Sequence, residues 1–179
     1  SGNFATVAVD DGASGGTATI NVALSGDAGL VKTGAGTLVL TASGNDYTGD
    51  TKISAGVLSV SADVLGNASS TMILDGGTFY ASGTMTLARN VGITSSNGTI
   101  TTDSGEILTM TGAIADQVAA TSGGFTFIGD GALVLSGPNT YTGGTTIAGG
   151  TVQISAQNNL GATTGGVAIS SNATLEATA

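Results

Sequence analysis

The chain contains no cysteine, no histidine, no tryptophan and a single proline, and it carries few charges. Without cysteine there is neither a disulfide framework nor thiolate chemistry. Without histidine, the Ser-His-Asp triad, the Cys-His pair and a His-ligated zinc site are excluded. Charged residues are 8% of the chain, against ~25% in a typical soluble domain. The basic residues are Lys32, Lys52 and Arg89, and with a net charge of −9 the chain would be repelled by phosphate, which excludes a nucleic-acid partner.

Long apolar runs and helix formers are scarce as well. No stretch reaches the ~18 apolar residues of a membrane-spanning helix. No positively charged segment followed by an apolar one opens the chain, so we expect no signal peptide and interpret the sequence as a fragment of a longer protein. Gly and Thr are poor helix residues, so a helical protein is disfavoured. Disorder is disfavoured too, because 40% of the residues are hydrophobic and few are charged.

What the chain has is small residues and alternating apolar pairs. Gly, Thr, Ala and Ser supply more than half of its 179 residues. Apolar residues recur with a period of two at several places, which predicts short β-strands. The alternating pairs are Leu38/Leu40, Leu58/Val60, Met85/Leu87, Phe125/Phe127, Leu133/Leu135 and Val152/Ile154.

The chain repeats itself at an offset of 94 or 95 residues. The matching segments are 34–40 with 129–135, 45–53 with 139–147, and 56–62 with 150–156, and Leu65-Gly66 returns as Leu160-Gly161. Together they define two copies of one long repeat, at residues 34–81 and 129–177. Self-similarity of this kind is typical of solenoids and repeat arrays.

A shorter period of about 20 residues runs through the chain. Its apolar members are Leu38, Leu58, Phe79, Ile100, Leu133, Val152 and Leu175. The gap of 33 residues between Ile100 and Leu133 is longer than the others, and we interpret it as an irregular turn of chain. Short strands at this period predict a parallel β-helix of about eight or nine coils, formed by residues 1–179 as a single unit. The alternative is an antiparallel β-sandwich, because Asn97-Gly98 between apolar residues is a hairpin signal.

The repeated residues resemble a known family. The order Gly-x-Gly-x-Leu-x-Leu, Asn-x-Tyr-Thr-Gly-x-Thr and Ile-x-x-Gly-x-Leu/Val is similar to the passenger-associated transport repeat of bacterial autotransporters, and it occurs at 34–58 and 129–152. The first copy departs from the pattern at Asp50, where the second has Gly144. The resemblance assigns a structural role in the repeat to Gly34, Gly36, Leu38, Leu40, Asn45, Tyr47, Thr48, Gly49, Gly56, Gly129, Gly131, Leu133, Leu135, Asn139, Tyr141, Thr142, Gly143 and Gly150.

The resemblance also implies a location, partners and a function. It implies a right-handed parallel β-helix at the surface of a Gram-negative bacterium, exported by type V secretion. The implied partners are flanking parts of the same precursor, among them a membrane β-barrel translocator. We expect a structural stem that supports export and folding and presents adhesive or effector regions. The alternative is an adhesin module that binds host glycan, matrix protein or a like molecule.

Two tyrosines are the aromatic candidates for a binding site. Tyr47 and Tyr141 could form a platform for stacking on sugars. Each recurs in the context Asn-x-Tyr-Thr-Gly, which favours a structural role at a coil junction. The amides of Asn45 and Asn139 would then satisfy backbone groups of turns, and Gly49 and Gly143 would supply the corner.

The carboxylates do not suggest an enzyme. Asp10-Asp11, Asp103 with Glu106, and Asp46 with Asp50 are the closest groups in sequence. Adjacent strand residues point to opposite faces, and the second repeat lacks both acids of the last group. The three basic residues are isolated in the sequence, which argues against a lyase site. The two Gly-x-Gly segments lack the third glycine and the helix of a phosphate loop. We therefore expect no catalytic residues, metal, cofactor or nucleotide.

Two surface features remain open for interaction. The Thr-rich outer faces have three interpretations: a solvated β-surface, a self-associating or adhesive surface, and an ice-binding surface, for which Thr-x-Thr is present at Thr84, Thr99 and Thr109. The second feature is the segment 116–124, which interrupts the 20-residue period. An interruption of a repeat is where a binding loop is expected.

Overall fold

The chain folds as a stack of parallel strands. The structure is a computed structural model, and it describes residues 3–10, 16–118 and 121–178. Every strand pairing within these residues is parallel. The strands form a β-solenoid of about eight turns. The predicted parallel β-helix is confirmed, and the antiparallel sandwich is wrong.

Three sheets run along the stack. Sheet A consists of β1 (Phe4–Ala8), β3 (Gly29–Thr33), β5 (Thr51–Ile53), β7 (Met72–Leu74), β10 (Val91–Ile93) and β13 (Ile114–Asp116). Sheet B consists of β2 (Thr17–Ile20), β4 (Thr37–Leu40), β6 (Val57–Val60), β8 (Thr78–Ala81), β11 (Gly98–Thr102), β14 (Phe125–Phe127), β16 (Thr145–Ile147) and β18 (Val167–Ile169). Sheet C consists of β9 (Met85–Leu87), β12 (Ile107–Met110), β15 (Ala132–Leu135), β17 (Thr151–Ile154) and β19 (Thr174–Ala177). A short 3-10 helix, η2 (Gln157–Leu160), follows β17.

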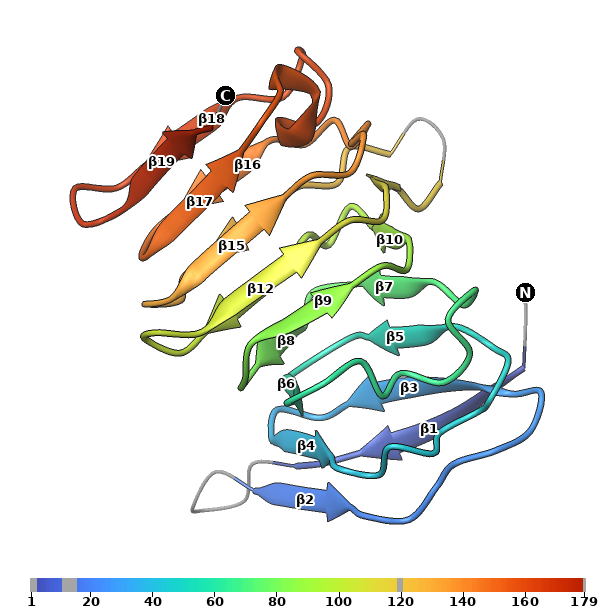
Figure 1. Cartoon of the computed structure of the whole chain (residues 1–179). Helices are drawn as coiled ribbons and strands as arrows, with labels where there is room; N and C mark the ends of the chain where they lie inside the picture. The colour runs from blue at the N-terminus through green and yellow to red at the C-terminus, as the bar shows by residue number, and fades with distance from the viewer. Residues whose placement is uncertain (1–2, 11–15, 119–120, 179) are drawn as a thin grey trace.

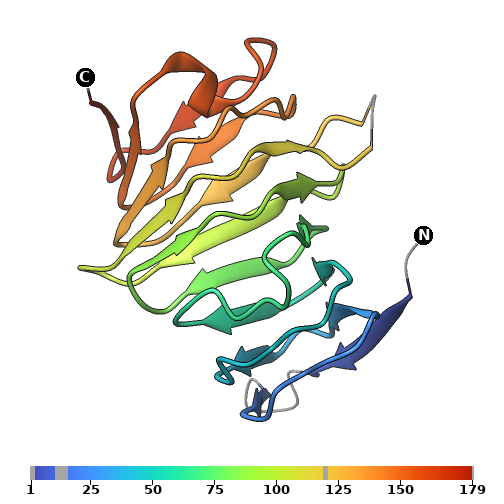
Figure 2. The same cartoon turned by 45° about the vertical axis from the view of Figure 1, so that its right-hand side comes forward.

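The two ends of the chain lie at opposite ends of the stack. β1 and β2 form one end and β18 and β19 the other, with the strands between them in chain order (Figure 1). The view turned by 45° shows the same column of coils from another side (Figure 2). At about 4.8 Å per strand, the 8 strands of sheet B span about 34 Å. Among the residues described, no helix has the length and apolar character needed to cross a membrane.

The core is built from ladders of equivalent side chains. In sheet B the inward ladder is fully buried and consists of Leu38, Leu58, Phe79, Ile100, Phe127 and Ile147. Burial of each such side chain stabilises the fold by roughly 1.5–3 kcal/mol. The alternate positions point outward, as the period of two predicts. Equal residues at equal positions therefore stack coil on coil.

The Asn97-Gly98 dipeptide lies at a corner between sheets. β10 before it belongs to sheet A and β11 after it belongs to sheet B, so the two strands do not form a hairpin. Asn97 has φ 61°, and it is the one non-glycine residue with positive φ among those described. Asn tolerates this left-handed conformation better than most residues, so the dipeptide that suggests a hairpin turns a solenoid corner instead.

The 33-residue gap in the short period has two causes. Ile100 lies in sheet B, but Leu133 lies in sheet C. The next member of the sheet B ladder after Ile100 is Phe127, which pairs with it in register. The change of sheet accounts for the last 6 of the 33 residues (127 to 133), and the coil from Ile100 to Phe127 still takes 27 residues because it includes the segment 116–124, where the irregular turn was expected.

The long repeat turns by one face between its two copies. The first copy places its strands in sheets B, A and B (β4, β5, β6), and the second places the matching strands in C, B and C (β15, β16, β17). From Leu38 to its match Leu133 the chain completes four coils in sheet B and then advances one face to sheet C. An offset of 94 or 95 residues is thus not a whole number of coils.

Each copy leaves one face of the coil without a strand. In the first copy, residues 41–50 and 61–71 connect sheet B to sheet A, where β9 and β12 later add sheet C. In the second copy, residues 136–144 and 155–166 connect sheet C to sheet B, in the place that β13 occupies one coil earlier. We call these four segments the face loops. The first loop of each copy, 41–50 or 136–144, carries the Asn-x-Tyr-Thr-Gly residues.

Candidate functional site

The first Asn-x-Tyr-Thr-Gly loop is tied to the coil on either side of it by one amide. Asn45 accepts a hydrogen bond from the Leu24 N–H on its Oδ1 (2.8 Å) and donates from Nδ2 to the Val64 carbonyl (2.7 Å). Leu24 lies one coil earlier and Val64 one coil later. A single side chain therefore links three consecutive turns of the solenoid.

The second loop has the same contacts. Asn139 accepts from the Ile114 N–H (2.8 Å) and donates to the Asn159 carbonyl (2.6 Å). Asn139 is buried, whereas Asn45 is half-buried. Asn159 adds a further link, because its Nδ2 donates to the Gly137 carbonyl (2.9 Å) and its Oδ1 accepts from the Ala156 N–H (2.8 Å). In each copy, side-chain amides thus satisfy backbone groups of the face loops, which lack strand pairing.

Both tyrosines lie inside the solenoid. Tyr47 is 3% exposed and Tyr141 is fully buried. Their hydroxyls share hydrogen bonds with Thr51 Oγ1 (2.7 Å) and Thr145 Oγ1 (2.5 Å). Burial raises the pKa of Tyr141 to about 12 and raises that of Tyr47 as well. Tyr141 also packs edge-on against Phe125, with ring centroids 5.5 Å apart. Neither ring is available for stacking on a sugar, so that alternative is wrong.

The glycine after each Tyr-Thr pair is required by space. Gly49 and Gly143 do not have positive φ. A Cβ on Gly49 would lie 2.2 Å from the Gly29 backbone nitrogen, and one on Gly143 would lie 2.5 Å from the Gly123 carbonyl carbon. The expected corner role is therefore wrong in its mechanism, because these glycines permit close approach of neighbouring coils.

The basic residues all have structural partners. Lys52 pairs with Asp75 (2.7 Å), and Arg89 pairs with Asp63 (2.7 Å). Lys32 is fully buried, and its Nζ donates to the carbonyls of Thr33 (2.7 Å), Gly34 (2.7 Å) and Ala55 (3.2 Å). Burial lowers the pKa of Lys32, and the charge of Asp10 partly offsets this. None of the three cations faces a cleft with paired acids.

Several of the carboxylates each accept a separate hydrogen bond. Asp103 accepts a hydrogen bond from the Tyr80 hydroxyl (2.5 Å), and Glu106 accepts one from Thr84 Oγ1 (2.5 Å). Asp50 accepts from the Thr71 N–H (2.8 Å). Asp11 lies outside the described residues. Within residues 3–10, 16–118 and 121–178, no group of three acids, histidines or cysteines is placed to hold a metal ion.

The interruption at 116–124 is held by hydrogen bonds near both of its ends. Its residues 119 and 120 lie outside those described. Asp116 accepts from the Gly123 N–H (2.9 Å) and from Thr142 Oγ1 (2.7 Å), which closes the segment onto the second Asn-x-Tyr-Thr-Gly loop. Gln117 and Val118 are exposed, Val118 by 60%. They line a hollow of about 330 Å³ together with Phe4, Asp50, Lys52, Ile73 and Thr94.

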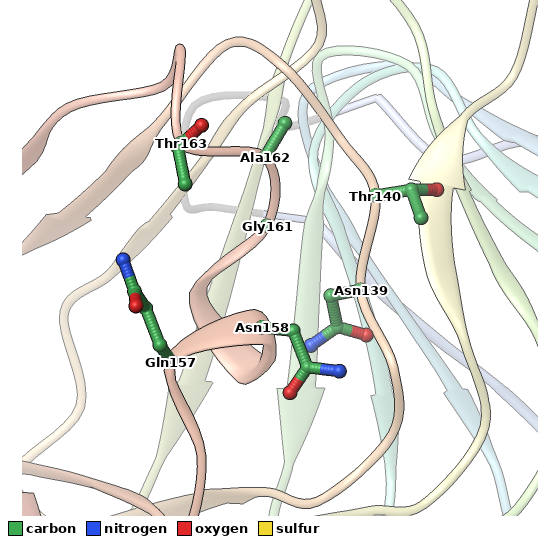
Figure 3. A pocket seen from close by; sticks show the side chains of 7 residues that line it. All are labelled: Asn139, Thr140, Gln157, Asn158, Gly161, Ala162 and Thr163. Carbon is green, nitrogen blue, oxygen red and sulfur yellow. The ribbon is translucent and has the colours of Figure 1, made fainter.

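A larger hollow lies over the second pair of face loops. It has a volume of about 520 Å³ and is lined by Asn139, Thr140, Gln157, Asn158, Gly161, Ala162 and Thr163. Figure 3 shows η2 on one side of it and the segment of Asn139 and Thr140 on the other. The lining is uncharged and consists of amides, hydroxyls and backbone. Sequence reasoning did not single out this hollow, because its residues are ordinary turn residues.

The outer face of sheet B carries a threonine ladder. Thr78, Thr99, Thr126 and Thr146 lie in one register on four consecutive strands and are half-buried. The Thr-x-Thr pair at Thr99 is flanked by Tyr80 on one neighbouring strand, so the double row does not continue. The structure therefore extends the threonines at this place as a single row and not as a double row.

Comparison with known proteins agrees with this geometry. The passenger-associated-transport-repeat family matches residues 30–60 and 125–154, which contain both Asn-x-Tyr-Thr-Gly loops. The Adhesin BmaC autotransporter of Brucella suis biovar 1 (strain 1330) is 40% identical over 154 residues, covering 83% of this chain. The chain is an autotransporter passenger repeat domain. No solved structure matches it.

The comparison indicates the location of the repeat domain and shows how much of its relative's length it covers. An autotransporter passenger is extracellular and exposed at the surface of a Gram-negative bacterium, as the resemblance implies. The repeat domain spans 4% of the length of the relative it matches. That relative is an adhesin by name.

Some contacts that hold the repeat together were not indicated by the sequence motif. Thr51 and Thr145 are the last residues of the Asn-x-Tyr-Thr-Gly-x-Thr order, but their bonds to the tyrosine hydroxyls four residues earlier were not predicted. Arg89 and Asp63 lie 26 residues apart and meet only because one coil stacks on another. No local pattern indicates that pair.

Proposed function

We propose that this repeat domain is a structural stem segment that supports export and folding of its passenger and presents adhesive or effector regions. The observation that carries the proposal is the use of the repeated side chains. Asn139 and Tyr141 are buried and bonded to neighbouring coils. The motif that defines the family therefore serves coil-to-coil cohesion, and no catalytic role is proposed for it.

Cohesion of this kind suits export without nucleotide chemistry. Repeat proteins gain stability through nearest-neighbour contacts, so each coil that folds outside the cell adds a favourable increment. An amide that links three coils makes the folding of one turn depend on the turns beside it. Folding outside would then favour outward movement of the rest of the chain. The partners of this role are the flanking parts of the same precursor, including its translocator.

The test compares a buried and an exposed residue of one loop in the autotransporter that carries this domain. Asn139→Ala removes both amide contacts, whereas Thr140→Ala changes its exposed neighbour. We expect Asn139→Ala to lower the amount of passenger that external protease reaches on whole cells, and Thr140→Ala to leave it unchanged. Equal exposure of both variants would count against a role in export.

A second function is favoured by the exposed part of the interruption. Gln117 and Val118 project beside a hollow that breaks the regular coil surface, and the relative is an adhesin by name. If this segment is a binding module, Val118→Asp should reduce attachment of cells to host glycan, matrix protein or one another while surface exposure stays normal. Normal attachment in that variant would remove this site.

A further inference from the structure

Arg89 fills a socket formed by residues 61–71, the second face loop of the first copy. The residue follows β9 and is 3% exposed. Its Nη1 donates to the carbonyls of Leu65 (3.0 Å), Asn67 (3.1 Å) and Ser70 (3.2 Å). Its Nη2 and Nε donate to the Asp63 carboxylate (2.7 and 3.1 Å). The planar guanidinium thus satisfies a ring of loop carbonyls and one carboxylate, which is the geometry its fixed fork of donors suits.

The second copy builds a similar turn 95 residues later. In the first copy the Asn67 N–H donates to the Tyr47 carbonyl (2.8 Å), and in the second the Ala162 N–H donates to the Tyr141 carbonyl (2.9 Å). The loops also close alike. Ser70 N–H donates to the Asn67 carbonyl, and Gly165 N–H donates to the Ala162 carbonyl, both at 3.0 Å.

The turn glycines of the two loops agree as well. Gly66 has φ 72° and Gly161 has φ 83°. A Cβ on either would meet the carbonyl oxygen and the ring of the tyrosine below it, Tyr47 or Tyr141. From Gly66 to Ser70 and from Gly161 to Gly165 the two loops therefore share these bonds, this turn and this tyrosine neighbour, although the 3-10 helix η2 precedes the turn only in the second copy.

A hollow also lies at the second loop, lined by residues that correspond to those around the Arg89 guanidinium. It has a volume of about 220 Å³ and is lined by Gln157, Leu160, Gly161, Ala162, Thr163, Gly165 and Val167. Leu160, Ala162 and Gly165 correspond to the three residues whose carbonyls bind Arg89. The hollow adjoins the one in Figure 3, which adds Asn158, the counterpart of Asp63.

We propose that this hollow is a second guanidinium socket. It takes an arginine side chain from a β-strand stacked over residues 155–166, the second face loop of the second copy. β9 presents Arg89 to the first loop in this way. Asn158 supplies a neutral amide oxygen in place of a carboxylate, so the second socket binds a guanidinium more weakly than the first. The proposal rests on the internal repeat and is independent of the stem role.

Backbone amide chemical shifts of the whole domain test the socket, with four probes. Two are small cations, ethylguanidinium and ethylammonium. Two are peptides, one with the sequence of residues 83–90 and one with its arginine replaced by lysine. We expect ethylguanidinium at millimolar concentration to shift amides of residues 158–165, and ethylammonium to leave them unmoved. Asn158→Asp, at an exposed position, should tighten ethylguanidinium binding about five- to tenfold, because a charged acceptor binds more strongly than a neutral one.

Arg89→Ala supplies the matched control, because it frees the first socket for the same probe. In that variant ethylguanidinium should also shift residues 63–70. The socket is refuted if Asn158→Asp shows no response at residues 158–165, or if ethylammonium acts as strongly as ethylguanidinium. Tighter binding of the arginine peptide than of ethylguanidinium, with no binding of the lysine peptide, supports a strand-borne arginine. Equal binding of that peptide and ethylguanidinium refutes the role of the strand.

Discussion

Removal of the Asn139 amide is the most direct test of how the face loops hold the coils together. Asn139→Ala deletes two hydrogen bonds and leaves the Ile114 N–H and the Asn159 carbonyl without this partner. Both bonds are buried, and an unsatisfied buried group costs about 1–3 kcal/mol. Asn139→Ala should therefore lower the free energy of unfolding by about 2–5 kcal/mol.

The same substitution at Asn45 provides a graded comparison. Asn45 makes the matching pair of bonds but is half-buried, so water can replace the amide in part. We expect Asn45→Ala to cost less than Asn139→Ala, and exposed Thr140→Ala to change stability by less than about 0.5 kcal/mol. Urea unfolding followed by circular dichroism, with the slope of the transition compared among variants, measures all three. A loss below about 1 kcal/mol for Asn139→Ala would refute the view that this amide holds three coils together.

Three further predictions concern pH and close packing. The pKa of Tyr141 is about 12 in the folded chain against an ordinary 10, so folding should lose about 2 kcal/mol of stability as pH rises from 10 to 12; Tyr141→Phe should remove this loss in urea unfolding at high pH. Burial alone would raise the pKa of Asp75, but hydrogen bonds from Lys52 and Thr94 and the charge of Lys52 outweigh it and lower the pKa below 3.8. Its contribution is therefore complete above the ordinary pKa and is lost as pH falls through the folded pKa, and unfolding of Asp75→Asn should depend less on pH in that range. Gly143→Ala should lower the unfolding midpoint sharply because its Cβ meets backbone at 2.5 Å, whereas Gly44→Ala, with 3.6 Å to its nearest neighbour, should not; equal midpoints would contradict the close-approach argument.

The repeat made most of the fold predictable, because periodicity in a solenoid is itself the structure. Alternating pairs such as Leu38/Leu40 and Phe125/Phe127 mark strands that the structure contains, and their inward sides form the core. The sheet to which a strand belongs was not predictable. Leu38 and Leu133 match in sequence but lie in sheets B and C, since sequence spacing records distance along the chain and not rotation about the axis.

The candidate site was predictable only as far as it is local. The Asn-x-Tyr-Thr-Gly motif identified Asn139 and Tyr141 because each loop carries its own copy. Neither the partners of the Asn139 amide nor the socket of Arg89 could be predicted, because those contacts join residues 19 to 26 positions apart on adjacent coils. Such contacts depend on which loop stacks above which.

Rotation of the repeat by one face changes which side of the solenoid lacks strands. A repeat of a whole number of coils would align every face loop on one side and leave that side without strands along its length. Here the strandless side changes from the position of sheet C to that of sheet A between the copies, while sheet B continues through 8 strands. The edge where sheet A ends, at β13, is covered by residues 136–144, through the bond from the Ile114 N–H to Asn139. Unpaired sheet edges invite association with other chains. The buried amide of the motif thus both joins the coils and closes the edge that the rotation creates.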